Sequence, residues 1–217
     1  MHQLNLADHV RFCEIDGQHI FLDLKADRYF SLPPAAAAAF LALLQGDASP
    51  AHVVGMHAAG LLVQAPAGRP LEPTTHPEPS SSFLEDGEIG LGLGMTLIAE
   101  TLFLVLGARQ AVRRKRLPGL LAKPGHGDSA SQEVCRERRD RALGQFLRAR
   151  RTIPIAPNCL YDSLALRRFL QRRSIPADLV IGTKLHPFAA HCWIQDGSMV
   201  LNDSLAEARG FAPILVG

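Results

Sequence analysis

Apolar and polar residues alternate in the first part of the chain, and a period of two predicts β-strands with one buried face. Asp16-Gly17 and residues 25–27 interrupt this alternation with residue types that favour tight turns. After Pro33 the composition changes to strong helix formers. The pattern predicts strands at residues 10–15, 19–24 and 28–32, followed by helices at residues 35–44 and 51–59.

Residues 66–82 are rich in proline, lack apolar periodicity and end in a run of serines, which is typical of a linker. We therefore expect an α+β protein with a small domain over residues 1–65, a linker over residues 66–82 and a larger domain over residues 83–217. A unit of about 65 residues is close to the lower limit for a core that folds unaided.

The apolar residues 89–108 precede a basic run at residues 113–116, so a membrane span with a basic flank has to be weighed. Three glycines and the charge of Glu100 favour a core helix instead. The next predicted helix, residues 132–150, is rich in arginine, which we interpret as a solvated face.

Charge and cysteine usage narrow the possible functions. A net charge of +2 and a pI near 8.5 are too mild to predict a nucleic-acid partner. The four cysteines show no close pairing, which argues against a disulfide framework and a cysteine-rich zinc site. Because the N-terminus lacks the features of a secretory signal, we expect a cytoplasmic protein with reduced cysteines.

Cys159 is the first candidate for chemistry. Two prolines keep the chain extended up to Asn158, and the spacing of apolar residues predicts a helix over residues 160–172, which places Cys159 in its first turn. The N–H groups and the positive dipole end there stabilise a thiolate, although a buried structural cysteine is the alternative. Asn158 and the N–H of Cys159 are candidate oxyanion donors.

A predicted hairpin, residues 190–195 and 199–203, follows a buried strand and carries the second candidate group. With a three-residue turn that puts Gly197 in the left-handed position, His191 lies opposite Asp203. Asp203 then accepts the Nδ1 proton of His191 and leaves Nε2 for the thiol of Cys159. With a two-residue turn, His191 instead faces Asn202, which is the fallback orienting residue.

The neighbouring Cys192 points to the other face of the strand, so we interpret it as part of the core. A zinc site built from His186, His191, Cys192 and Asp203 would need ligands on both faces of one strand. We therefore expect no metal.

The order cysteine, histidine, aspartate is the one used by papain-like and transglutaminase-like folds. The C-terminal part of this chain resembles the lasso peptide maturation protease family, and the resemblance covers roughly 45 residues in one order. It is carried by residues 159–166, 174–177, 179–182, 187–193 and 201–203.

The resemblance implies a cysteine peptidase that uses Cys159, His191 and Asp203 as nucleophile, base and orienting residue. Such an enzyme removes the leader from a ribosomally made precursor before a partner closes the macrolactam. The implied partner is an asparagine-synthetase-like macrolactam synthetase, to which any need for ATP would belong, so no cofactor is expected. A membrane-bound exporter is a further candidate partner, with the protein then peripheral at the inner face of the membrane.

The N-terminal unit, with three strands and then helices, resembles the RiPP recognition element, a small winged-helix-like domain that binds leader peptides. The resemblance implies that the leader pairs with the edge of the third strand. The implied leader-binding residues are Arg28, Tyr29, Phe30, Ser31 and Leu32.

Two other functions remain open from the residues alone. An acyltransferase of the same fold would let an amine, rather than water, resolve the thioester. A catalytically inactive module would only deliver the precursor to the synthetase.

Overall fold

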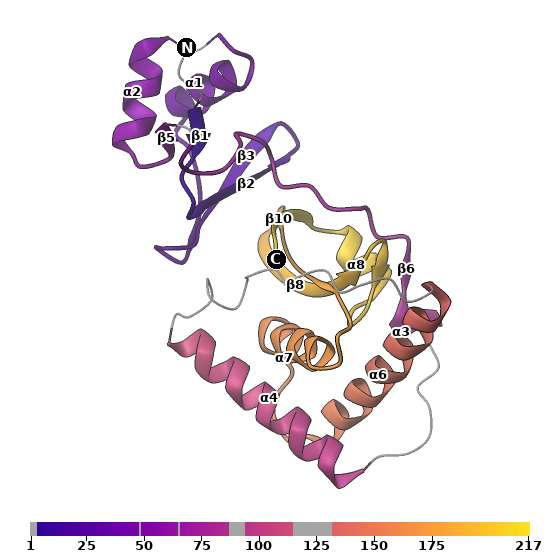
Figure 1. The fold of residues 1–217 in the computed structure, drawn as a ribbon. Coiled ribbons are helices and arrows are strands. Elements are labelled where there is room, and N and C mark those ends of the chain that lie inside the picture. Colours follow the sequence, from indigo (N-terminus) through magenta and orange to yellow (C-terminus); the bar gives the residue numbers. More distant parts are fainter. Residues whose placement is uncertain (1–3, 48, 65, 87–93, 115–131) are drawn as a thin grey trace. The chain divides into compact units, whose positions relative to one another are not determined.

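The computed structural model describes residues 4–47, 49–64, 66–86, 94–114 and 132–217 (Figure 1). The start of the apolar segment, residues 89–93, lies outside the described residues. The chain forms two compact units. The first comprises Met1–Thr75 and Ala212–Leu215, and the second comprises His76–Phe211 and Val216–Gly217.

The first unit contains an antiparallel sheet with the strand order β2-β3-β4. Asp16 and Gly17 form the first turn with φ values of 50° and 74°, the pair of positive angles that a two-residue type I′ turn requires. At the second turn, the Asp23 carboxylate accepts hydrogen bonds of 2.9 Å from the N–H groups of Lys25 and Ala26. The three predicted strands are confirmed as β2 (Val10–Ile15), β3 (Gln18–Asp23) and β4 (Arg28–Ser31).

Two helices and a short pair of strands complete this unit. The two predicted helices are confirmed as α1 (Pro34–Leu44) and α2 (Pro50–Ala58), and a short antiparallel pair joins β1 (Leu4–Leu6) to β5 (Leu62–Gln64). Phe12, Phe21 and Phe40 meet in the core with ring centroids 5.0–5.7 Å apart. Each such aromatic pair contributes about 0.5–1.5 kcal/mol beyond the burial of its surface.

The second unit contains strands β6 to β9 of a five-stranded sheet with the order β10-β7-β8-β9-β6, whereas most of β10 is grouped with the first unit. Its two longest strands are antiparallel and place Gly182 opposite His191. Ser81 and Ser82, the last residues of the predicted linker, form β6 and run parallel to β9. The strands are β6 (Ser81–Ser82), β7 (Asp178–Leu185), β8 (Phe188–Asp196), β9 (Met199–Val200) and β10 (Ala212–Val216).

Helix α7 lies between this sheet and the helices α4 and α6 (Figure 1). Leu164, Leu166, Phe169 and Leu170 of α7 are buried because the helix is covered on two sides. The helices of the unit are α3 (Phe83–Asp86), α4 (Met95–Arg113), α6 (Gln132–Thr152), α7 (Cys159–Gln171) and α8 (Leu205–Arg209).

Among the described residues, α4 is the one helix long and apolar enough to cross a membrane. One side of it, including Leu104 and Val105, is buried, whereas Phe103 on the other side is 71% exposed. Glu100 forms ion pairs of 3.3 Å with Arg172 and 2.8 Å with Arg173, which explains a charge within an apolar segment. The expectation of a core helix thus holds for one face of α4.

Candidate active site

Helix α7 begins at Cys159 because its neighbours form a reciprocal cap. Asn158 has an extended backbone, and its Oδ1 accepts a 3.1 Å hydrogen bond from the N–H of Tyr161. In return, the Asp162 carboxylate accepts a 3.1 Å hydrogen bond from the N–H of Asn158. This arrangement satisfies N–H groups that a helix start leaves unpaired, and it fixes Cys159 as the first helical residue.

Arg150 holds the segment that precedes α7 in place. Its Nε donates to the Asp162 carboxylate at 2.7 Å, and the same guanidinium donates to the carbonyl of Ile155 at 3.0 Å. The side chains of Arg150 and Asp162 are only 11% and 19% exposed, so the ion pair is shielded from water. The end of α6 and the start of α7 are therefore held together beside Cys159.

His191 reaches Cys159 from strand β8. Its imidazole is in hydrogen-bond contact with the Cys159 thiol and is packed by the rings of Phe211, 5.2 Å away, and Trp193, 6.1 Å away. The opposing residue on β7 is Gly182, where a Cβ would lie 2.7 Å from Cβ of Phe211 and 2.9 Å from the Trp193 ring. Only glycine leaves room for this packing.

Asp203 holds the other side of the imidazole. One carboxylate oxygen contacts Nε2 of His191, and the other accepts a 2.8 Å hydrogen bond from the N–H of Ser204. Its backbone carbonyl accepts a 2.5 Å hydrogen bond from the hydroxyl of Ser82. The side chains of His191 and Asp203 are 18% and 22% exposed.

These contacts shift the pKa values of both His191 and Cys159. Hydrogen bonding to Asp203 and then to Cys159 raises the pKa of His191 to about 10, despite the opposing effect of burial. The pKa of Cys159 is lowered, first by hydrogen bonding to His191 and further by the N–H groups of Cys192 and Leu160. The lowered pKa of Cys159 and the raised pKa of His191 both favour a thiolate beside an imidazolium, an arrangement that can attack a carbonyl carbon.

The comparison with protein families decides the class of this domain. The model described as "Transglutaminase-like superfamily" matches residues 101–216, which is more than half of the chain. The chain belongs to the transglutaminase-like superfamily. The matched region of this transglutaminase-like domain includes Cys159, His191 and Asp203.

A curated protein is similar to part of this transglutaminase-like chain. The Microcin J25-processing protein McjB of Escherichia coli is 47% identical over 47 residues, covering 22% of this chain and 23% of that protein. The matched stretch thus spans about a quarter of the length of this relative. Together, the two matches confirm the predicted resemblance to lasso peptide maturation proteases. No solved structure matches the chain significantly.

The predicted register of the hairpin in the transglutaminase-like domain was wrong. The turn is made by Gly197 and Ser198, with Asp196 opposite Met199 and Gln195 opposite Val200, and this pairing is neither of the two that the sequence left open. The ladder ends at Val200, and the chain then bends over residues 201–203. Asp203 meets His191 through this bend rather than as a cross-strand partner.

The predicted orientation of the imidazole was also reversed. Asp203 contacts Nε2 of His191 rather than Nδ1, which leaves Nδ1 on the side of Cys159. The fallback residue, Asn202, does not face the imidazole: its Oδ1 accepts from the N–H of Ile194 at 2.7 Å, and its Nδ2 donates to Ser163 at 2.9 Å.

Cys192 is buried, and burial raises the pKa of its thiol, which confirms the interpretation of this residue as core. Within the described part of the chain, no group of three or more His, Cys, Asp or Glu side chains is arranged to hold a metal ion.

The predicted leader-binding residues lie in the other unit, where residues 28–31 form β4 at the edge of the sheet and Leu32 follows it.

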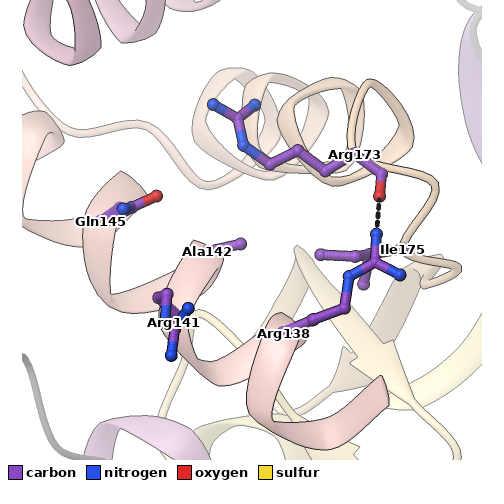
Figure 2. A pocket seen from close by; sticks show the side chains of 6 residues that line it. All are labelled: Arg138, Arg141, Ala142, Gln145, Arg173 and Ile175. Atoms are coloured by element: carbon purple, nitrogen blue, oxygen red, sulfur yellow. Dashed lines mark hydrogen bonds between the residues drawn. The ribbon is translucent and has the colours of Figure 1, made fainter. Parts of the chain in front are cut away.

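Two features of the domain were not predicted. Ser163, one helical turn after Cys159, is buried and bonded to β8, and its spacing of four from Cys159 was the available signal. A hollow of about 190 Å³ lies at the other end of α7 (Figure 2). Arg138 and Arg173 line it, but the guanidinium of Arg173 is paired with Glu100 and only its carbonyl accepts from Arg138, at 3.2 Å.

Proposed function

We propose that the protein is a cysteine peptidase that removes the leader from a ribosomally made lasso precursor. The observation that carries this proposal is the contact of Cys159, His191 and Asp203 in a transglutaminase-like domain. The similarity to McjB, which is described as a processing protein, supports a precursor peptide as the substrate.

The reaction proceeds in two steps. The thiolate of Cys159 attacks the scissile carbonyl carbon, and the imidazolium of His191 gives its proton to the leaving amine as the C–N bond breaks. This releases the core peptide with a free N-terminal amine and leaves the leader as a thioester. Water then attacks the thioester while His191 takes one of its protons, which frees the leader acid and restores the thiolate and imidazolium pair. Asp203 keeps the imidazole in place throughout.

The oxyanion formed in each step needs hydrogen-bond donors. We assign this role to the backbone N–H of Cys159 and to Nδ2 of Asn158, whose Oδ1 is already used in the helix cap. Both groups lie at the positive end of α7, which favours negative charge.

The first unit is proposed to bind the leader as a winged-helix-like recognition domain. Among the described strands, β4 pairs only with β3, so its outer edge can accept an added strand. Arg28 lies over the ring of Phe30, 5.4 Å from its centroid, and presents a charge beside this edge. Residues 28–32 are therefore the proposed leader-binding segment. Holding the leader on the same chain would raise its effective concentration at Cys159.

The proposed partner is a macrolactam synthetase, which would use the amine that cleavage releases and would supply any requirement for ATP. The free thiols of Cys159 and Cys192 fit a reducing cytoplasm. The exposed side of α4, with Met95 at 80% and Leu106 at 46% exposure followed by Arg113, supports peripheral contact at the inner face of the membrane, where an exporter would lie.

An acyltransferase shares the first step, and the amine that resolves the thioester would distinguish it. Purified protein and synthetase are incubated with the precursor in the presence of a primary amine, and the molecular mass of the released leader is measured by mass spectrometry. A peptidase releases the leader as a free acid at every amine concentration. A leader that becomes an amide in proportion to the amine would instead establish the acyltransferase.

A further inference from the structure

Ser163 is a buried polar side chain on the face of α7 that carries Cys159. The two residues are four positions apart, so their side chains lie one above the other on the helix. This helix packs against β8, and the exposed fraction of Ser163 is 0%. A buried hydroxyl destabilises a fold unless it is hydrogen-bonded, so the partners of Ser163 indicate why it is there.

The backbone of Cys192 on β8 is held by α7 at two points. Its carbonyl accepts a 3.1 Å hydrogen bond from the hydroxyl of Ser163. Its N–H contacts the sulfur of Cys159. Because these contacts are one helical turn apart, a slide of α7 along β8 would disturb both of them.

Asn202 adds further hydrogen bonds, and together with those of Ser163 they form what we call the Ser163 and Asn202 connection. Its Nδ2 donates to the Ser163 hydroxyl at 2.9 Å, while its Oδ1 accepts from the N–H of Ile194, the second residue after Cys192 on β8. Asn202 also directly precedes Asp203, which contacts His191. One amide therefore joins the helix of the candidate nucleophile, the strand of the candidate base and the segment that carries Asp203.

We propose that Ser163 and Asn202 are positioning residues that fix the register of α7 against β8 and so hold the Cys159 sulfur beside His191. This inference rests on the proposed function in treating Cys159 as the nucleophile. Ser163 and Asn202 act through the backbone of β8, whereas Cys159 and His191 are the reacting groups.

The test follows Cys159 itself and requires no substrate. Full-length Ser163→Ala, Asn202→Ala and the double variant are alkylated with iodoacetamide over a range of pH, and mass spectrometry follows the peptide that contains Cys159. We expect the alkylation rate at mildly acidic pH to fall about three- to tenfold in each single variant, because Cys159 is then held less firmly against His191 and the N–H of Cys192, which stabilise its thiolate. The double variant should fall no further than the slower single variant, since both residues act through one connection.

A matched control separates positioning from general stability. Leu143 is fully buried in α6, outside the Ser163 and Asn202 connection, so Leu143→Ala lowers the melting temperature and should leave the pH profile of Cys159 unchanged. If Asn202→Ala does not fold, Ser163→Ala alone tests the positioning role, because it removes a single oxygen atom and disturbs the fold less.

The result that overturns the inference is an unchanged pH profile in folded variants whose melting temperatures fall like that of Leu143→Ala. Because this measurement uses no precursor, that result would leave the proposed peptidase intact. Leader cleavage that survives Cys159→Ala would instead contradict the proposed peptidase function. The alkylation result on Ser163 and Asn202 would still hold.

Discussion

The imidazole of His191 on β8 is in hydrogen-bond contact with the thiol of Cys159 at the first residue of α7. The helix start and the hydrogen bonds from backbone N–H groups stabilise negative charge on the sulfur. Asp203 stabilises positive charge on the imidazole. The sulfur and the imidazole thus each favour the charged form of the other.

This charge pair predicts how the reaction depends on pH. Because the pKa of His191 is raised from 6.5 to about 10, the imidazolium persists through neutral pH and is lost as the pH rises through about 10. Because the pKa of Cys159 is lowered from 9.0, its thiolate persists to a lower pH than that of an ordinary cysteine and is lost as the pH falls further. We expect kcat/KM to give a bell with its alkaline limb near 10. If kcat/KM instead showed only one limb, rising near pH 9 as for an ordinary thiol, this would contradict a thiolate and imidazolium pair.

Asp203→Asn should uncouple this pair while keeping the size of the side chain. Losing a contacting carboxylate lowers the pKa of a histidine by about 1–3 units, and the thiolate loses its cationic partner with it. We expect the alkylation rate of Cys159 at mildly acidic pH to fall about 10- to 1,000-fold. The comparison variant is Asp196→Asn, which changes a carboxylate that pairs with Arg139 rather than with His191. Equal effects of the two variants would argue against a special role of Asp203.

Gly182→Ala should disturb the packing behind His191. The added Cβ would lie 2.7 Å from Cβ of Phe211 and 2.9 Å from the Trp193 ring, and overpacking of this kind costs about 1–3 kcal/mol. Thermal unfolding measures the loss. Gly107→Ala in α4 is the matched control, since nothing lies within 4 Å of its added Cβ and alanine favours a helix by up to about 1 kcal/mol. A melting temperature unchanged by Gly182→Ala would show that this packing yields easily.

Two substitutions of Asn158 separate its role as a cap from its proposed role toward the oxyanion. Asn158→Asp keeps an oxygen for the N–H of Tyr161 and loses the Nδ2 donor, so stability should hold while kcat falls by about 10²-fold or more. Asn158→Ala should lose the same activity and about 1 kcal/mol of stability as well. Full activity in a folded Asn158→Asp variant would limit Asn158 to the cap.

The position of Cys159 could be predicted because the signals for it are local. Prolines before Asn158, a residue type that caps helices and a helical spacing of apolar residues all lie within one short stretch of sequence. The three strands of the first unit were predictable for the same reason, since Asp16-Gly17 specifies its own turn.

The relation of Asp203 to His191 was predicted as a partnership, but its geometry was not. The bend over residues 201–203 is held by Ser82, which donates to the Asp203 carbonyl, and by Glu85, which accepts from the N–H of Leu205 at 3.0 Å. These contacts come from a segment far away in the sequence. Neither alternation nor turn composition reveals them, so the register that the sequence favoured put Asp203 on a strand that ends at Val200.

Release of leader from the precursor by Cys159→Ala and Cys192→Ala variants shows whether Cys159 is the nucleophile. Both substitutions remove a free thiol, one at the start of α7 and the other on β8 next to His191. Each variant is incubated with the precursor and the synthetase, and free leader is measured by mass spectrometry. We predict that Cys159→Ala releases no leader while a folded Cys192→Ala still does. Leader release that survives Cys159→Ala would show that Cys159 is not the nucleophile.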